Sequence, residues 1–202
     1  MKKLIVIAAL LAGISIAQAQ ERMPRAEALK YAFYACQDLK QLLNTPIPTD
    51  PDVKRPVVVY EGDYGAMILP ETKLAADQLA KAGAQPVPVA QLWLHKLVPL
   101  DGTLAVRSER LQMATVQREG EQATLPLCAL AVCKGADGKL ELVVYGKAKD
   151  PVLRAPLKPI TATQEDPVEV TAERQEEGGL LTLKILGKYE ASFMVTDPEQ
   201  HQ

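Results

Sequence analysis

Residues 168–195 read VEVTAERQEEGGLLTLKILGKYEASFMV, and apolar and polar side chains alternate along most of this segment. The alternation falls into three runs, 168–173, 181–185 and 189–195. A period of two residues is typical of a strand with one buried face. Gly178-Gly179 and Gly187-Lys188 separate the runs and favour turns. The segment therefore predicts a three-stranded antiparallel meander that must cover one apolar face.

Another meander is predicted earlier in the chain, over residues 105–147. Its strands are expected near 105–117, 123–133 and 139–147, with turns at 119–121 and at Asp137-Gly138, a strong hairpin signal. Residues 123–133 are apolar on both faces, which indicates a central strand covered on both sides. Two meanders bury their apolar faces best by packing together. We therefore predict a mainly β protein with an N-terminal helix, an antiparallel β-sandwich that is immunoglobulin-like in general shape.

The remaining segments fit around this sandwich. Residues 56–70 predict a β-hairpin, residues 71–82 a short helix, and residues 92–98 a strand. Three prolines between 150 and 159 favour an edge strand or a crossover between sheets. We expect one β-rich domain over 53–196, because each half alone would be marginal in size, and a polar tail over 197–202.

Residues 20–52 predict an amphipathic helix followed by a proline-rich connector. The helix is expected over 24–44, with Pro24 at its start and Asn44-Thr45-Pro46 at its end. Its predicted apolar stripe consists of Leu29, Phe33, Cys36, Leu39 and Leu43. Such a helix is unstable alone, so the stripe is expected to dock either on the β-rich body or on a partner.

The first nineteen residues predict a secretory signal. Lys2 and Lys3 precede an apolar run that ends in Ala17-Gln18-Ala19, which is typical of a peptide cleaved after Ala19. The leader resembles that of a bacterial lipoprotein, but Ile14 stands where the lipid-bearing cysteine would be, so no lipid anchor is expected. Without Lys2 and Lys3, 21 basic residues face 25 acidic ones. The expected product is periplasmic or secreted, about 183 residues long, with a net charge near −4.

Composition argues against several function classes. The acidic mature chain has no basic stripe for phosphates, so nucleic acid is not an expected partner. Aromatic residues are few, with one Trp, two Phe and six Tyr to stack on bases or sugars. No second apolar segment of membrane length follows the signal, so no membrane span is expected after cleavage.

Three cysteines remain after cleavage. Cys128 and Cys133 lie five residues apart in one predicted strand, which separates their Cα atoms by roughly 17 Å, well beyond disulfide range. Only Cys36 paired with one of them is a plausible bridge. The alternative, which the sequence favours, is three small buried thiols.

No catalytic or metal motif stands out. An acyl-transfer enzyme needs a nucleophile and a base, and the weak candidate is His95 with Cys36, although a half-buried strand histidine is the simpler interpretation. No zinc-ligand spacing appears, and the nearest calcium-like cluster is Thr49-Asp50-Pro51-Asp52 with Glu61 and Asp63. The last two could also be imagined as a glycosidase pair. No cofactor and no metal are predicted.

An acidic stretch over 165–177 carries one basic residue, Arg174. It indicates either a solvated sheet face that discourages edge aggregation or a surface for a basic partner.

These observations favour a non-enzymatic cell-envelope module that binds another protein or itself through a sheet edge, a loop end or the N-terminal helix. The alternatives are a secreted hydrolase that uses His95 and a carrier that holds a small apolar ligand between helix and sheet.

Overall fold

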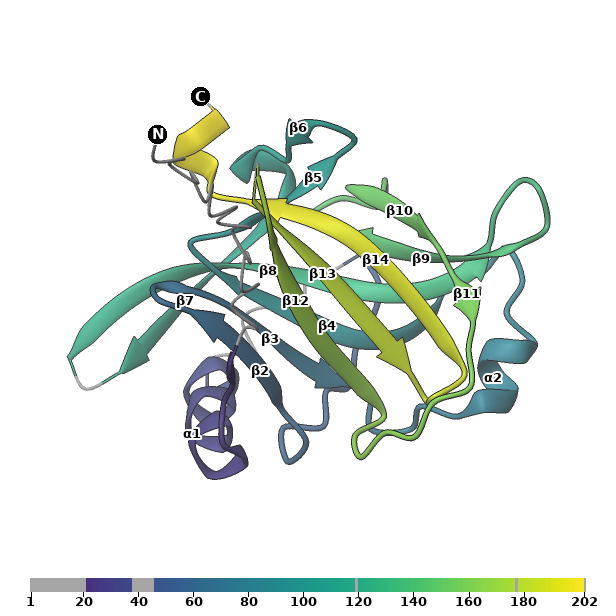
Figure 1. Ribbon diagram of the computed structural model, residues 1–202, viewed down its shortest axis with the longest axis horizontal. Coiled ribbons are helices and arrows are strands. Elements are labelled where there is room, and N and C mark those ends of the chain that lie inside the picture. The colour runs from purple at the N-terminus through teal and green to yellow at the C-terminus, as the bar shows by residue number, and fades with distance from the viewer. Residues whose placement is uncertain (1–20, 38–45, 119, 177, 202) are drawn as a thin grey trace, which may run out of the picture.

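The computed structural model describes residues 21–37, 46–118, 120–176 and 178–201. Strands make up 52% of it and helices 13%. The strands form two antiparallel sheets that pack as two layers, as Figure 1 shows. The predicted β-sandwich is therefore confirmed, whereas its immunoglobulin-like shape stays a prediction. Within the described residues, no helix is long and apolar enough to cross a membrane.

The first sheet contains eight strands in the described chain. Seven follow one another in hydrogen-bonding order: β1 (Glu21–Arg22), β2 (Val57–Glu61), β3 (Tyr64–Pro70), β4 (Val87–His95), β8 (Glu121–Lys134), β9 (Leu140–Tyr145) and β10 (Leu153–Pro156). The eighth, β7 (Gln112–Arg118), pairs with the first half of β8. Because β4 pairs with the second half of the same strand, the β7–β8 hairpin extends beyond the sheet as an arm (Figure 1).

The second sheet contains the meander predicted from residues 168–195. Its order is β12 (Val168–Gln175), β13 (Gly178–Ile185), β14 (Tyr189–Thr196), β5 (Val98–Asp101) and β6 (Leu104–Ala105), and β11 (Lys158–Pro159) also pairs with β14. The described residues contain two α-helices, α1 (Arg25–Cys36) and α2 (Ala76–Ala80), and two short 3-10 turns, Ser108–Arg110 and Pro198–His201.

The main core lies between the two sheets and follows from the alternation of side chains. Ile68, Leu92 and Leu130 point inward from the first sheet, and Val170 and Leu183 meet them from the second. All five are almost completely buried. Burying side chains of this kind stabilises the fold by about 1.5–3 kcal/mol each relative to exposure.

The central position predicted for residues 123–133 is confirmed. Leu130 and its neighbours on one face of β8 join the core between the sheets, whereas Ala129, Ala131 and Cys133 on the other face pack against Ile47. Residues 150–159 form the edge strand β10 and then cross to β11 in the second sheet, as the prolines indicated.

Several predicted boundaries were wrong. The meander predicted over 105–147 starts at Gln112 instead of 105, because Leu104–Ala105 pair with β5 in the other sheet. The helix expected over 71–82 is only α2, five residues long. Strand β4 begins before the expected Leu92, at Val87, because a register shift between Pro88 and Ala90 accommodates the proline.

The prediction for the N-terminal helix was wrong about its buried face. Helix α1 packs on the outer face of the first sheet through Ala28, Ala32 and Ala35, whereas Leu29 and Phe33 are 38% and 61% exposed. Alanines let the helix axis approach the sheet closely, and the bulky Met67 and Trp93 fill the interface from the sheet side. The predicted end of the helix, with Leu39 and Leu43, lies outside the described residues.

The acidic stretch also has an unexpected role. Asp166 is 1% exposed, and its carboxylate pairs with Arg22 at 3.0 Å and Arg25 at 3.2 Å, with Arg55 at 3.8 Å. Arg22 precedes α1, Arg25 begins it and Arg55 lies just before β2, so the basic partners of this carboxylate belong to the protein itself. The ion pairs connect α1 to the second sheet.

Candidate functional site

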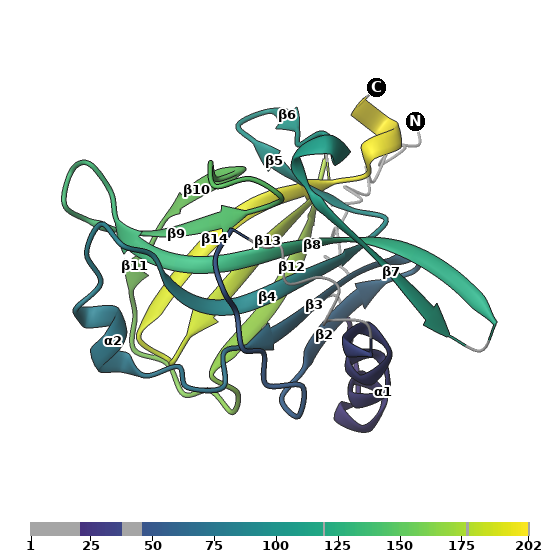
Figure 2. The ribbon, with the colours of Figure 1, turned by 180° about the vertical axis from the view of Figure 1, so that it is seen from behind.

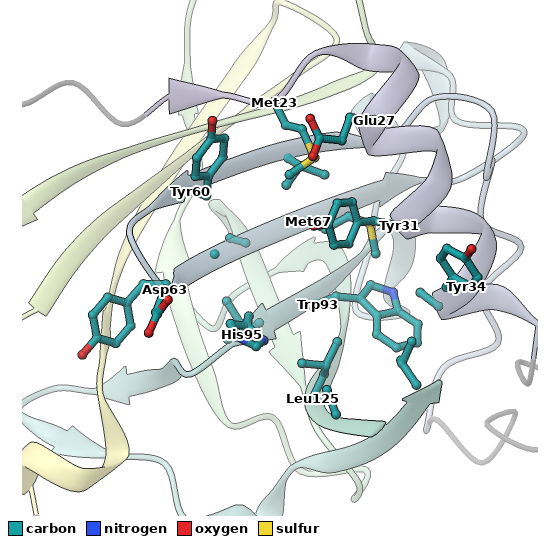
Figure 3. A pocket seen from close by; sticks show the side chains of 18 of the residues that line it. Met23, Glu27, Tyr31, Tyr34, Tyr60, Asp63, Met67, Trp93, His95 and Leu125 are labelled. Atoms are coloured by element: carbon teal, nitrogen blue, oxygen red, sulfur yellow. The ribbon is translucent and has the colours of Figure 1, made fainter. Parts of the chain in front are cut away.

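A groove lies between α1, the outer face of the first sheet and the arm formed by β7 and β8. Its cavity volume is about 560 Å³, which is within the range of small-molecule sites. Figure 2 shows α1 and the arm beside this face of the sheet, and Figure 3 shows the side chains between them.

The floor of the groove is apolar. Met67 on β3 and Trp93 on β4 are direct neighbours in the sheet, and both point away from the core between the sheets. The indole N–H of Trp93 donates to Gln91 Oε1 at 3.2 Å, and Gln91 Nε2 donates to Thr49 Oγ1 at 2.8 Å. Because this chain of hydrogen bonds satisfies the indole N–H, the ring contributes an apolar surface to the site.

The two walls come from segments that are far apart in the sequence. Helix α1 contributes Glu27, Tyr31 and Tyr34, which lie at helical spacing beside the alanine face. The arm contributes Val116 from β7 and Ala123 from β8, which are paired in register, so they share one face of the hairpin.

Polar residues close the end of the groove near the β2–β3 turn. Lys96 Nζ lies 2.9 Å from Asp63 Oδ2, and this cation lowers the pKa of the Asp63 carboxyl. The hydroxyl of Tyr64 donates to Asp197 Oδ2 at 2.7 Å. Burial lowers the pKa of His95, and Lys96 lowers it further, so His95 is neutral at pH 7.

His95 and Leu97 lie on different sides of the first sheet, although plain alternation along the predicted strand over 92–98 would place them on the same face. Lys96 has a φ of 55°, which breaks the alternation at the end of β4 and turns the chain toward β5 in the second sheet. Trp93 and His95 therefore line the groove, whereas Leu97 packs in the core between the sheets.

The cysteines form no disulfide, so neither possible bridge of Cys36 is present. Burial raises the pKa of Cys36 and of Cys128 to about 12. Both thiols therefore stay protonated near neutral pH, and a protonated thiol is a weak nucleophile. His95 lines the groove, but Cys36 is not among the lining residues, so these two catalytic candidates are not brought together at this site.

The acidic residues considered for calcium or for glycoside hydrolysis are engaged separately. Glu61 pairs with Arg174 at 3.2 Å, Asp63 pairs with Lys96, and Asp52 Oδ1 accepts the N–H of Lys54 at 3.0 Å. Within the described ranges, no group of three or more His, Cys, Asp or Glu side chains is arranged to hold a metal ion.

Sequence reasoning named only His95 and Asp63 among the groove residues discussed here. It missed Tyr31 and Tyr34 because they lie outside the predicted apolar stripe. Trp93 also lines the groove, although it is only 2% exposed. The one available signal was the clustering of three tyrosines in the helix segment and the hairpin that follows the connector, at Tyr31, Tyr34 and Tyr60.

Comparisons with known proteins give no indication of function, so the residues of the groove are the main guide to it. No family model, no curated protein and no solved structure matches the chain.

Proposed function

We propose that the protein is a non-enzymatic binding module of the cell envelope, periplasmic or secreted, that holds a small and mostly apolar ligand in the groove beside α1. The single observation that carries the proposal is the groove itself. It has a cavity volume of about 560 Å³ and a floor of Met67 and Trp93, with polar groups gathered at its rim. Ligand sites are typically concave and apolar with a few polar groups that orient the ligand. The location is proposed from the signal-like pattern of residues 1–19.

A binding role accounts for the groove better than the hydrolase alternative. A hydrolase that uses His95 as a base needs a nucleophile within hydrogen-bond reach. The Cys36 thiol is protonated near neutral pH and does not line the groove. A carrier needs only the shape and the apolar floor.

Filling the groove tests the proposal. Ala123→Phe places a ring in the groove, and Thr124→Phe places the same ring on the opposite, exposed face of β8. After native purification and denaturation, mass spectrometry is expected to find one small molecule released from wild type and Thr124→Phe. Ala123→Phe is expected to release about tenfold less ligand or none. The added ring occupies part of the groove, so the ligand loses at least one well-packed contact there. Equal release from the two variants, or no released ligand from wild type, would contradict the proposal.

A second candidate function is suggested by the outward face of α1. Leu29 and Phe33 are exposed large apolar residues one helical turn apart, and exposed apolar surface of this kind marks protein contacts. In this alternative the module binds another envelope protein through α1.

Cross-linking with quantitative mass spectrometry tests the second candidate. The double variant Leu29→Ser/Phe33→Ser is expected to lower recovery of a specific partner by about fivefold or more, as for loss of a central contact. Ala26→Ser/Lys30→Ser is the matched control, because it introduces the same residues at exposed positions of the same helix. Equal recovery with both variants would exclude α1 as the contact.

A further inference from the structure

We infer that the groove takes an organic cation with an apolar body, a long-chain amine or quaternary ammonium compound, rather than a neutral or anionic lipid-like molecule. This inference rests on the proposed function and names the chemical class of its ligand. It follows from the charges and the aromatic faces that surround the cavity.

The rim of the groove is negatively charged. Glu27, Asp63 and Glu121 line it, and none of the described lining residues is a lysine or an arginine. Lys96 lies next to Asp63 and neutralises it, whereas Glu27 and Glu121 form no ion pair with the residues whose side chains the structure describes. With His95 neutral, the described lining holds two further carboxylates and no lysine or arginine, an arrangement that favours a cation over an anion.

These two carboxylates stand on opposite walls. Glu27 projects from α1 near Met23, as Figure 3 shows, and Glu121 belongs to the start of β8 in the arm. A cationic head bound at the rim is attracted by both, while its apolar chain lies along the floor against Met67 and Leu125.

Aromatic faces supply the second attraction. Tyr31, Tyr34 and Tyr60 line the groove and are each partly exposed, so their rings are accessible to a ligand. The Tyr60 hydroxyl donates to Glu21 Oε2 at 2.8 Å, which brings a further carboxylate to this rim. Tyrosine rings attract ammonium groups through their negative faces, and a quaternary ammonium keeps this attraction while giving up little hydration.

Three octyl probes that differ only in their heads test the inference: octyltrimethylammonium, 1-octanol and 1-octanesulfonate. Trp93 is the only tryptophan of the chain and lies on the groove floor, so its fluorescence reports binding directly. Octyltrimethylammonium is expected to bind about tenfold more tightly than octanol, and octanesulfonate more weakly than both. The preference for the cation is expected to shrink at high salt, because both carboxylates are exposed.

A charge-removing variant identifies the groups responsible. Glu27→Gln/Glu121→Gln is expected to lower the affinity for octyltrimethylammonium about tenfold and leave that for octanol unchanged. Glu109→Gln/Asp150→Asn is the matched control, because it removes the same number of exposed carboxylates outside the groove. It is expected to bind all three probes like wild type.

The outcomes separate this inference from the proposed function. If the probes bind with equal affinity and Ala123→Phe blocks them all, the groove is a binding site without charge preference, and the inference is overturned while the proposed function stands. An equal loss of cation affinity in both charge variants also overturns it. If no probe binds wild type, both proposals fail.

Discussion

Replacing Leu130 with alanine is expected to lower the free energy of unfolding by about 3–5 kcal/mol, the range for fully buried leucines in rigid cores. Leu130 is completely buried at the centre of β8, between its partners Ala90 on β4 and Val144 on β9. Neighbouring strands on both sides keep the backbone from collapsing into the space left by the lost side chain. Urea unfolding followed by far-UV circular dichroism measures the change.

Leu104→Ala is the matched control for this change. Leu104 lies in the short strand β6 and is 74% exposed, so its removal leaves no cavity. It is expected to alter the free energy of unfolding by less than about 0.5 kcal/mol. A similar loss in both variants would show that β8 does not hold the central position described above.

Gly187→Ala is expected to lower the free energy of unfolding by about 2–4 kcal/mol, through backbone strain and a steric clash together. Gly187 lies in the turn between β13 and β14 with a φ of 64°. A Cβ at this position would collide with the carbonyl oxygen of Ala162. The N–H of Ala162 donates to the carbonyl of Gly187 at 2.9 Å, so moving one segment disturbs the other.

Two glycine variants separate strain from collision. Gly138 has a φ of 79°, and a Cβ at this position would meet only open space, so Gly138→Ala is expected to cost about 1 kcal/mol from strain alone. Gly83 has neither a positive φ nor a close neighbour, so Gly83→Ala is expected to be nearly neutral. Equal effects at Gly187 and Gly138 would rule out the collision with Ala162. Thermal and urea unfolding of the three variants provide the comparison.

The strand pattern could be predicted from sequence where two local signals agreed. Residues 168–195 combine three alternating runs with glycine turns, and β12, β13 and β14 follow the predicted runs closely. Asp137-Gly138 likewise lies in the turn between β8 and β9. In both places the turn sets the register and the alternation sets the buried face, so no distant contact is needed to choose between alternatives.

The face of α1 could not be predicted from periodicity alone. A prediction of the buried helix face follows the largest apolar side chains. It therefore chose the side of Leu29 and Phe33 rather than the side of Ala28 and Ala32. The actual face depends on the sheet beneath, where Trp93 leaves room only for small helical residues. The ion pairs of Asp166 further fix how the chain enters the helix, and they join residues 144 and 141 positions apart.

The groove could not be predicted from the sequence either, because it too depends on contacts between distant segments. Its lining comes from α1, the β2–β3 hairpin, β4 and the arm, and no single segment carries a recognisable motif. The break at Lys96 was equally invisible, because a left-handed residue at a strand end leaves no mark when it is not a glycine. Only the pairing of β4 with β3 and of β5 with β14 shows where one sheet ends and the other begins.

The ion pairs that Asp166 forms with Arg22 and Arg25 have a consequence for the order of folding. During synthesis from the N-terminus, the α1 segment emerges long before residue 166, and its ion pairs with Asp166 cannot form until the segment just before β12 has been made. Contacts of such sequence separation carry a high loop-closure cost and form late. The wall of the groove that α1 supplies is therefore locked only when the last sheet is in place, so an incompletely folded chain does not present a finished site.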